Sequence, residues 1–530
     1  MGDIFGRHGL EPPAPSAPPA ADAHALARDA WGRFVAIWAP AADGPASAYR
    51  DPSGAFELHA WSLAPGLHVL TSDFSRAPAE LSAPHAYLNW DRIGAFVVAP
   101  QVCTTAPLMD GIVAAGPGEC IRLSEPPSKE AVWRPADYCA PHGAGPRDLE
   151  TELVRRVDVC TAALVRSRKV VLELSGGLDS AIVAGSLAAQ GLSPRAATAV
   201  YFDFPRPEAD ERRFAAAVAL RAALSVEVRR WVPGVIDEAD LKDLADGPWP
   251  AVMGVDARHD RTLTDILVGT GSDAVLSGQG GDGVFFQMPS ALIVADGWRT
   301  DGMGVFVGPL LPNVARRLRT SIWSVLRQAA RGVAAAPPNP ISSLTTDALR
   351  RAVGDPLHAW TTAARGAGLP PGKQLHIEAL ANTQTYNGGS RAARVADHLF
   401  PLAAQPVVEL ALGVPTPLLA GASYDRPFAR AAFRDRIPQA IYDRNVKGST
   451  TAYFQQLVAQ SREALEPFLV DGVLADAGVL DRGAVAQALD PGALISGAAR
   501  GADVMWAAAV EAWVRHWQTR TADAPGRGRR

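Results

Sequence analysis

The chain has 530 residues, of which 48% are hydrophobic and 20% are charged, as in most folded soluble proteins. At roughly 150 residues per domain, this length allows two or three domains and excludes a single small binding module. The formal net charge of −4 provides no overall basic field to hold a phosphate backbone, which argues against nucleic acid as a partner.

The cysteines and the hydrophobic runs predict a cytoplasmic protein. The four cysteines include no C-x-x-C pair and are too few to staple a chain of this size. No run of about 18 uncharged apolar residues is present, and the start of the sequence lacks the apolar core of a signal peptide. Neither a membrane span nor export is therefore expected.

The N-terminal part is predicted to be β-rich. Residues 11–20 (EPPAPSAPPA) are expected to form an extended, mobile connector, because proline and alanine offer little to bury. Segments with β-branched or aromatic residues predict strands at 33–38, 56–61, 67–73 and 94–99. A turn-rich linker at 135–146 ends this part, so residues 1–140 are assigned to a first domain.

Strands and helices alternate after the linker. Apolar residues at helical spacing predict a helix over 147–168. Strands follow at 169–174, 196–204, 225–232 and within 272–283, with helices at 180–191 and 208–224. This alternation favours right-handed crossovers and a parallel α/β sheet. Because residues 343–520 have a mainly helical pattern, 147–520 are assigned to a second domain, and 521–530 are expected to be a disordered tail.

The first candidate site is SGGLDS (175–180), where a buried strand turns into a helix N-terminus. Two glycines let the backbone approach a ligand, the helix end adds positive potential and the serines donate hydrogen bonds, which suits a pyrophosphate. An ordinary strand-to-helix turn is the alternative. Asp179 would repel a phosphate unless a divalent cation lay between them, so it implies Mg²⁺. Since G-x-x-x-x-G-K-[ST] is absent, the loop is expected to hold the pyrophosphate half of ATP and to leave the α-phosphorus open.

The second candidate site is SGQGGDGVF (277–285), whose glycines satisfy G-x-G-x-x-G. A dinucleotide fingerprint opens the first βα unit, whereas this loop follows the fourth predicted strand of the second domain, so a dinucleotide site is disfavoured. Asp282 instead adds a carboxylate at the carboxyl edge of the same sheet. Asp179 and Asp282 are therefore predicted to share one Mg²⁺ complex.

The third candidate site is DRNVKGSTTAYF (443–454), with Arg444 and Lys447 before a small polar run. The plainer interpretation of R-x-x-K is a solvated face. The functional interpretation is a mobile segment that closes over a nucleotide.

Together, SGGLDS, SGQGGD and R-x-x-K-G resemble the asparagine synthetase-like ATP pyrophosphatases, which adenylate a carboxylate and transfer it to an amine. Four further segments resemble the lasso peptide cyclases: RDPSGA (50–55), LMDGIVAAGPGE (108–119), FPLAAQPVVELALGVP (400–415) and DRNVKG (443–448). The resemblance covers nearly the whole chain. It implies a β-rich, glutaminase-like domain of the Ntn type, followed by an α/β ATP pyrophosphatase domain with C-terminal helices.

Two departures from the family pattern bear on function. Glutaminase-active relatives expose a cysteine at position 2, whereas this sequence begins Met1, Gly2, Asp3 and its first cysteine is Cys103. The resemblance therefore implies a degenerate first domain that releases no ammonia. Many relatives also place an acidic residue just before P-F-L-D. In VADHLFPLAAQ (395–405), Asp397 is the nearest candidate for this catalytic carboxylate, and a surface aspartate is the alternative.

The resemblance assigns roles to individual residues. Pyrophosphate and metal are assigned to Ser175, Gly176, Gly177, Asp179 and Ser180, with Asp282 as the second metal carboxylate. Backbone contacts that flank the nucleotide are assigned to Leu174, Ser277 and Gly278. Lys447 would neutralise charge on the phosphates and the acyl adenylate, assisted by Arg444.

The function implied is that of an ATP- and Mg²⁺-dependent macrolactam synthetase. It would adenylate an Asp or Glu side chain of a precursor (core) peptide for attack by the peptide's N-terminal amine, releasing AMP and pyrophosphate. A leader peptidase and a leader-recognition protein are the implied partners. The alternatives are a β-lactam synthetase-like enzyme that closes a small-molecule ring, and a non-catalytic peptide-binding scaffold. The retained Asp179, Asp282 and Lys447 weigh against a scaffold, since each would be an unneeded charge.

Overall fold

The computed structural model describes residues 2–6, 23–39, 44–102, 106–204, 210–332, 341–444, 451–497 and 500–520. The predicted connector at 11–20, Lys447 and the tail at 521–530 lie outside these residues.

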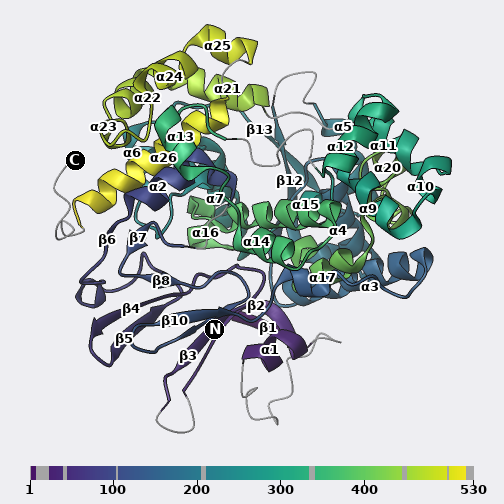
Figure 1. The fold of residues 1–530 in the computed structure, drawn as a ribbon, viewed down its shortest axis with the longest axis horizontal. Coiled ribbons are helices and arrows are strands. Elements are labelled where there is room, and N and C mark those ends of the chain that lie inside the picture. The colour runs from purple at the N-terminus through teal and green to yellow at the C-terminus, as the bar shows by residue number, and fades with distance from the viewer. Residues whose placement is uncertain are drawn as a thin grey trace.

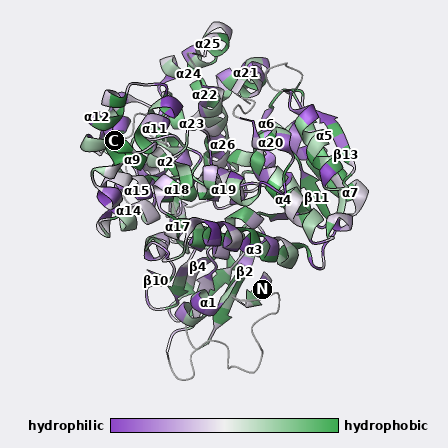
Figure 2. Ribbon diagram, turned by 90° about the vertical axis from the view of Figure 1, so that its right-hand side faces the viewer, coloured by the Kyte–Doolittle hydropathy of each residue, from purple (hydrophilic) through white to green (hydrophobic). Residues whose placement is uncertain are grey.

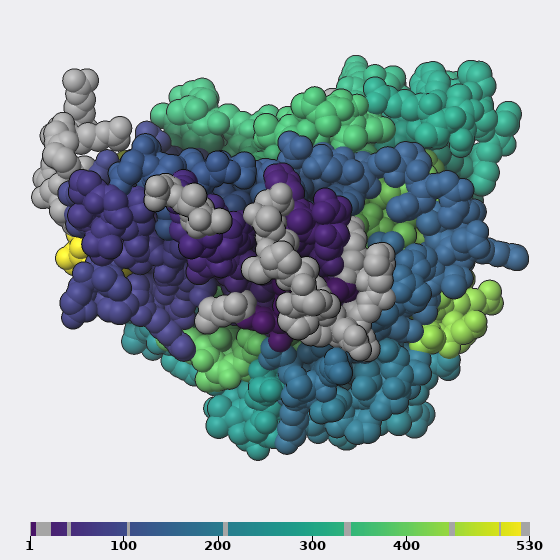
Figure 3. Space-filling model, turned by 90° about the horizontal axis from the view of Figure 1, so that it is seen from below, coloured from purple at the N-terminus to yellow at the C-terminus, as the bar shows by residue number. Residues whose placement is uncertain are grey.

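The N-terminal part is built from antiparallel strands, drawn in purple and dark blue in Figure 1. One sheet has the order β1 (Gly2–Gly6), β2 (Ala30–Trp38), β3 (Ser47–Arg50), β9 (Glu119–Arg122) and β10 (Ser128–Ala131). A second sheet has the order β5 (Leu67–Thr71), β4 (His59–Ala64) and β8 (Val113–Ala114), and β6 (Tyr87–Leu88) pairs with β7 (Met109–Asp110). Seen from below, residues of this part cover much of one face of the molecule (Figure 3).

One predicted strand of this part is wrong. Residues 94–99 lie mostly in helix α2 (Trp90–Val98) rather than in a strand. The Asn89 side chain caps this helix by accepting a hydrogen bond from the Arg92 backbone amide at 3.0 Å. Ile93 and Val97 are four residues apart and both buried, so the apolar run is one face of a helix.

The part of the chain after residue 146 contains the predicted parallel sheet. Its order is β13 (Val226–Arg230), β12 (Ala196–Asp203), β11 (Val170–Glu173), β14 (Ala274–Leu276) and β15 (Asp397–Leu399), and every pair is parallel. The fifth strand, β15, is missing from the sequence prediction, because three residues within a helical region give no strand pattern. The fold is therefore mixed α/β, as predicted, with an antiparallel N-terminal region, a parallel sheet and C-terminal helices.

Helices follow and flank these strands. Their remaining bounds are α1 (Ala23–Asp29), α3 (Pro146–Val165), α4 (Leu178–Ala189), α5 (Arg212–Arg221), α6 (Glu238–Asp243), α7 (Ala257–Thr270), α8 (Gly281–Val284), α9 (Leu292–Asp301), α10 (Gly304–Val307), α11 (Leu310–Leu318), α12 (Ile322–Arg331), α13 (Asp347–Val353), α14 (Ala359–Gly366), α15 (Pro371–Ala381), α16 (Arg391–Val395), α17 (Gln405–Gly413), α18 (Thr416–Ala420), α19 (Pro427–Ala432), α20 (Gln439–Tyr442), α21 (Thr451–Gln460), α22 (Arg462–Val470), α23 (Val473–Asp476), α24 (Arg482–Ala488), α25 (Pro491–Ser496) and α26 (Gly501–Gln518).

Side chains of the parallel sheet alternate between two helical layers. Val170 and Leu172 of β11 belong to the core that α3, α4 and α5 cover, whereas Val171 packs in the core under α7 and α16. The first three residues of this strand are hydrophobic and buried because both of its faces are covered (Figure 2). A sheet covered on both faces leaves its carboxyl edge as the place where loops converge.

The C-terminal helices also pack against the N-terminal strands. The ring of Phe74 lies 5.5 Å from that of Trp517 in α26. Trp61 of β4 and Trp513 of α26 belong to one buried cluster. The first and last parts of the chain thus share a core, with α26 lying beside α2 in Figure 1.

Candidate active site

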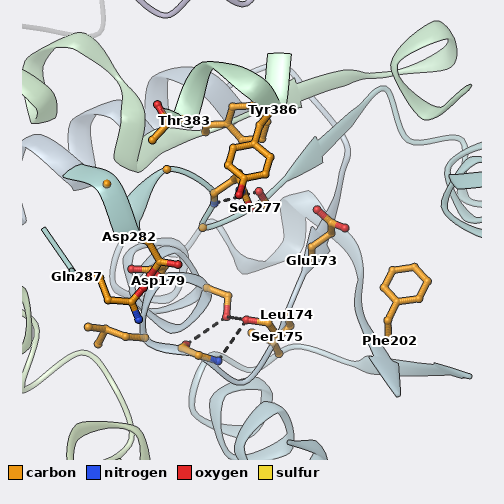
Figure 4. Close-up of a pocket in the computed structure, with 18 of the residues that line it drawn as sticks. Glu173, Leu174, Ser175, Asp179, Phe202, Ser277, Asp282, Gln287, Thr383 and Tyr386 are labelled. Carbon is orange, nitrogen blue, oxygen red and sulfur yellow. Dashed lines mark hydrogen bonds between the residues drawn. The ribbon is translucent and has the colours of Figure 1, made fainter. Parts of the chain in front are cut away.

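A cavity of about 970 Å³ opens at the carboxyl edge of the parallel sheet. The chain leaves β11 toward β12 on one side and returns through β14 on the other, so the loops after β11 and β14 meet where the strand order reverses. Such a switch point is where parallel α/β sheets bind ligands. Both predicted glycine-rich loops line this cavity (Figure 4).

The loop after β11 has the geometry expected of an anion cradle. Gly176 has a φ of +72°, and Gly177 forms the N-cap of the 12-residue helix α4. Ser175 Oγ lies 3.2 Å from Ser180 Oγ and accepts from the Gly177 amide at 3.3 Å. The first amides and hydroxyls of a helix thus face the cavity beside the positive end of its dipole. Leu174 is buried, and its amide donates to the Val200 carbonyl at 2.9 Å.

The loop after β14 packs directly against this cradle. A Cβ at Gly278 would lie 2.5 Å from the Asp179 carbonyl carbon and from the Ser180 amide nitrogen, so only glycine permits this approach. The neighbouring Ser277 donates its amide to the Leu399 carbonyl at 3.1 Å. The structure therefore brings together the predicted residues of both loops.

The two predicted metal carboxylates lie side by side in Figure 4. The Nη1 atom of Arg426 donates to Asp179 Oδ2 and to Asp282 Oδ1, each at 2.5 Å. One cation therefore already bridges both carboxylates. In the residues that the structure describes, no group of three or more His, Cys, Asp or Glu side chains could hold a metal. Two carboxylates beside an anion cradle fit Mg²⁺, which is usually bound by one or two carboxylates together with substrate phosphates.

Arg444 reaches the cradle from the other end of the chain. Its Nη1 atom donates to the Gly176 carbonyl at 2.9 Å, and its guanidinium ion-pairs with Glu211 and lies 4.3 Å from the Phe214 ring centroid. Arg430 donates at 2.8 Å to the carbonyls of Ile441, Tyr442 and Arg444. Arg444, the last residue described before 451, is thus held against the loop after β11.

The structure does not bring Asp397 to the cavity. This residue begins β15 and lies opposite Ala274, at the amino edge of the sheet. Its carboxylate ion-pairs with Arg168 at 2.6 Å and with Arg33 at 3.2 Å. Arg168 also binds Asp3 of β1 at 2.7 Å. This geometry joins β1 and β2 to the parallel sheet, a role that the sequence analysis does not predict.

Carboxylates that sequence reasoning missed do line the cavity. Asp260, Asp425 and Glu211 each ion-pair with an arginine. Glu173, at the carboxyl end of β11, has no ion pair with any residue that the structure describes, and its carboxylate points into the cavity (Figure 4). A signal was present, because Glu173 is the charged residue that ends the apolar strand just before Ser175.

Part of the cavity lining is aromatic. Phe202 and His259 stack with ring centroids 4.2 Å apart, and Trp231 lies 5.1 Å from His259. Tyr386 and Met253 also line the cavity. The cavity thus combines the two glycine-rich loops with aromatic side chains, and its volume gives room for a nucleotide and a second substrate.

Comparison with known proteins agrees with this geometry. The profile of the asparagine synthase family matches residues 153–515, which include both glycine-rich loops, Asp282, Arg426 and Arg444. A search of curated proteins gives no match. No helix among the described residues is long and apolar enough to span a bilayer. Asparagine synthase domains form amide bonds with ATP, and this chain belongs to the asparagine synthase family.

Proposed function

We propose that this amide ligase is a macrolactam synthetase that closes an isopeptide ring in a lasso-type precursor peptide. The observation that carries the proposal is the cavity of about 970 Å³, which is lined by both glycine-rich loops and also by the ring cluster of Phe202, Trp231 and His259. An apolar wall suits the side chains of a folded peptide. Ammonia, the smallest amine acceptor, would need no such space.

The proposed reaction has two steps. An Asp or Glu side-chain carboxylate of the peptide attacks the α-phosphorus of ATP, forming an acyl adenylate and releasing pyrophosphate. The peptide's N-terminal amine then attacks the acyl carbon, the C–N bond forms, the C–O bond to AMP breaks and one proton leaves the nitrogen. Holding the two reacting groups of one peptide together makes the second step intramolecular and so gives it a large effective molarity.

The residues of the chain divide this work between them. Ser175, Ser180 and the amides that begin α4 would hold the pyrophosphate, and Arg444 would steady the loop through the Gly176 carbonyl. Mg²⁺ bound by Asp179 and Asp282 would neutralise phosphate charge. Lys447 keeps its proposed role at the acyl adenylate. Glu173 is our candidate for the proton acceptor, since it lies in the cavity without an arginine partner among the described residues.

We also propose that the enzyme does not use glutamine. Gly2 lies in β1 opposite Phe34, where a Cβ would be 2.0 Å from the Arg33 carbonyl oxygen. Burial raises the thiol pKa of Cys120 and of Cys139 to about 11 in each case. A thiolate is the nucleophilic form, so neither cysteine is poised for glutamine hydrolysis. A cytoplasmic location and partnership with a leader peptidase and a leader-recognition protein remain part of this proposal.

The test is product analysis with a leader-free core peptide. The proposal expects AMP and pyrophosphate in equal amounts, together with a peptide lighter by one water. Added glutamine should change neither rate nor yield. ADP and phosphate as products, or glutamate released in step with the ring, would contradict it. Ring closure on a small amino acid in place of the peptide would favour a β-lactam synthetase-like enzyme.

A further inference from the structure

Arg426 joins the two phosphate loops by occupying the space between their carboxylates. Its Nη1 atom bonds both Asp179 and Asp282, and its Nη2 atom lies 2.8 Å from Asp425 Oδ2. These partners come from α4, α8 and the turn before α19. A guanidinium therefore sits where the proposed Mg²⁺ would need to bind.

The burial of this cluster is uneven. The Arg426 side chain is 3% exposed and that of Asp179 is 12% exposed, whereas that of Asp282 is 45% exposed. The Gln287 amide lies against the two Asp282 oxygens, at 2.8 and 3.1 Å, when its nitrogen faces them. Burial alone would lower the pKa of Arg426, but Asp179 and Asp282 outweigh it and raise the pKa, so the group stays a cation. Solvent therefore reaches the cluster at Asp282 and hardly at all at Arg426.

Arg426 is also the cation that the cluster can exchange. The other guanidinium, that of Arg430, binds Asp425 at 2.7 Å and is held by three backbone carbonyls. Arg426 has a φ of +48°, a backbone conformation that non-glycine residues rarely adopt and that concentrates at functional sites.

We propose that Arg426 is a resident counter-cation that keeps the metal position closed until a nucleotide arrives. The carboxylate oxygens that bind its Nη1 atom are those that would ligate the metal, so guanidinium and metal exclude each other. A guanidinium binds phosphate oxygens as well as carboxylates. When ATP enters with its metal, Arg426 leaves the aspartates for the phosphates, and Mg²⁺ takes its place. This inference rests on the proposed ATP and Mg²⁺ chemistry, although not on the identity of the peptide.

Exchange of this kind couples metal binding to nucleotide binding. Without nucleotide, a divalent cation must break two short ion pairs and leave Arg426 with Asp425 alone among the three aspartates. With nucleotide, the phosphates take the place of the two lost carboxylates. The metal should therefore bind weakly alone and tightly together with nucleotide, and the coupling must be reciprocal.

The experiment measures Mn²⁺ binding to the full chain by electron paramagnetic resonance, with no peptide present. Without nucleotide, Arg426→Met should bind Mn²⁺ at least about tenfold more tightly than the wild type, since the guanidinium no longer competes with the metal for the Asp179 and Asp282 oxygens. With α,β-methylene ATP, which cannot be cleaved at the α-phosphorus, the wild type should gain at least about tenfold in Mn²⁺ affinity, and Arg426→Met should gain less. Arg426→Gln should match Arg426→Met, and it serves if the methionine variant does not fold.

Arg317→Met is the matched control. Arg317 lines the same cavity, but its guanidinium donates to the carbonyl oxygens of Gln287 and Ala420 rather than to a carboxylate. It should therefore leave the Mn²⁺ affinity nearly unchanged. If Arg426→Met and Arg317→Met gained equally in Mn²⁺ affinity without nucleotide, the cause would be a general loss of positive charge. If the Arg426 variants gained no Mn²⁺ affinity, the guanidinium would not block the metal. Either result overturns the proposal. Because no turnover is measured, this outcome is independent of whether the peptide reaction itself is confirmed.

Discussion

At each edge of the parallel sheet, one arginine bridges two aspartates, but the two clusters differ in their surroundings. At the amino edge, Arg168 bridges Asp3 and Asp397 at 2.7 and 2.6 Å. At the carboxyl edge, Arg426 bridges Asp179 and Asp282 at 2.5 Å each. An arginine between two aspartates thus says nothing about function by itself.

The surroundings decide the difference. At the amino edge, Arg33 adds a second guanidinium, so two arginines balance two aspartates and the cluster ties β1 to β15. At the carboxyl edge, the Asp282 side chain is 45% exposed, glycines bring two loops into contact and the N-terminus of α4 faces a large cavity. The carboxylates of this edge therefore lie where a ligand can reach them, whereas those of the amino edge join β1 to the parallel sheet.

The largest expected effect separates the two edges by activity. Asp179→Asn keeps the shape of the side chain but loses the charge that holds the metal, so ring formation should fall about 100- to 1000-fold. Asp397→Asn should change the rate per folded molecule by less than about twofold, because it lies at the other edge. Mass spectrometry of the ring, alongside pyrophosphate release, measures both. If Asp397→Asn lost most of its rate of ring formation while its circular dichroism spectrum matched that of the wild type, Asp397 would have to be returned to the active site.

The next effect separates the edges by stability. Arg168→Met leaves Arg33 alone to balance the two partly buried carboxylates of Asp3 and Asp397, so the free energy of unfolding should fall by about 2 kcal/mol. Urea unfolding measures this change, and the activity of the folded fraction should persist. Arg155→Met, which removes an exposed ion pair to Glu152 on α3, is the control and should cost less than about 1 kcal/mol. If both variants lost equal stability, the amino-edge cluster would have no special role in joining β1 to the sheet.

A smaller effect is expected at Glu173, and it concerns the second step of the proposed reaction rather than the first. Glu173→Gln should slow ring closure about tenfold if the carboxylate accepts the proton of the amine. Pyrophosphate release should continue, and hydroxylamine, which is neutral near pH 7, should trap the acyl adenylate at the wild-type rate. Quantifying hydroxamate and ring in the same reaction makes the comparison. A raised KM for ATP with unchanged partition between the two products would instead place Glu173 at the nucleotide.

The smallest effect is a pH dependence at the amino edge. Burial would raise the pKa of Asp397, but Arg33 and Arg168 outweigh it and hold that pKa below its usual value. A carboxylate of this kind stabilises the fold above the unfolded pKa near 4 and loses that contribution as the pH falls through the folded pKa. The stability difference between the wild type and Asp397→Asn, about 1 kcal/mol at neutral pH, should therefore shrink as the pH falls below the unfolded pKa near 4 and vanish once the pH has passed the lower, folded pKa. Urea titrations across this range test it, and a difference independent of pH would contradict the ion-pair origin.

The predictions from sequence succeed where periodicity and local motifs carry the information. Alternating strands and helices from residue 147 onward predict the parallel sheet, and the strand-to-helix position of SGGLDS predicts its place at the carboxyl edge. They fail where tertiary packing decides. Residues 94–99 have the composition of a strand, but all except the last belong to helix α2. The reason is tertiary packing, since Ile93 and Val97 are buried in one cluster with residues of α26 and of the N-terminal strands.

The site was predicted in part for the same reason. Glycine-rich loops can be recognised from a short local motif. Arg426, in contrast, lies 247 residues after its partner Asp179, in a stretch without a motif. Asp397 was chosen by its position before a proline, but the register of β15 against β14 places it at the amino edge. Long-range ion pairs of this kind depend on topology, which no local pattern encodes.

The central claim, that a peptide carboxylate is activated as an acyl adenylate, can be tested most directly with oxygen-18. A core peptide labelled at both oxygens of the reacting Asp or Glu side chain is incubated with the enzyme, ATP and Mg²⁺, and the products are analysed by mass spectrometry. The account predicts one oxygen-18 atom in AMP for each ring formed, because the C–O bond breaks after the carboxylate oxygen has joined the α-phosphorus. Label found in inorganic phosphate, or in neither product, would contradict it.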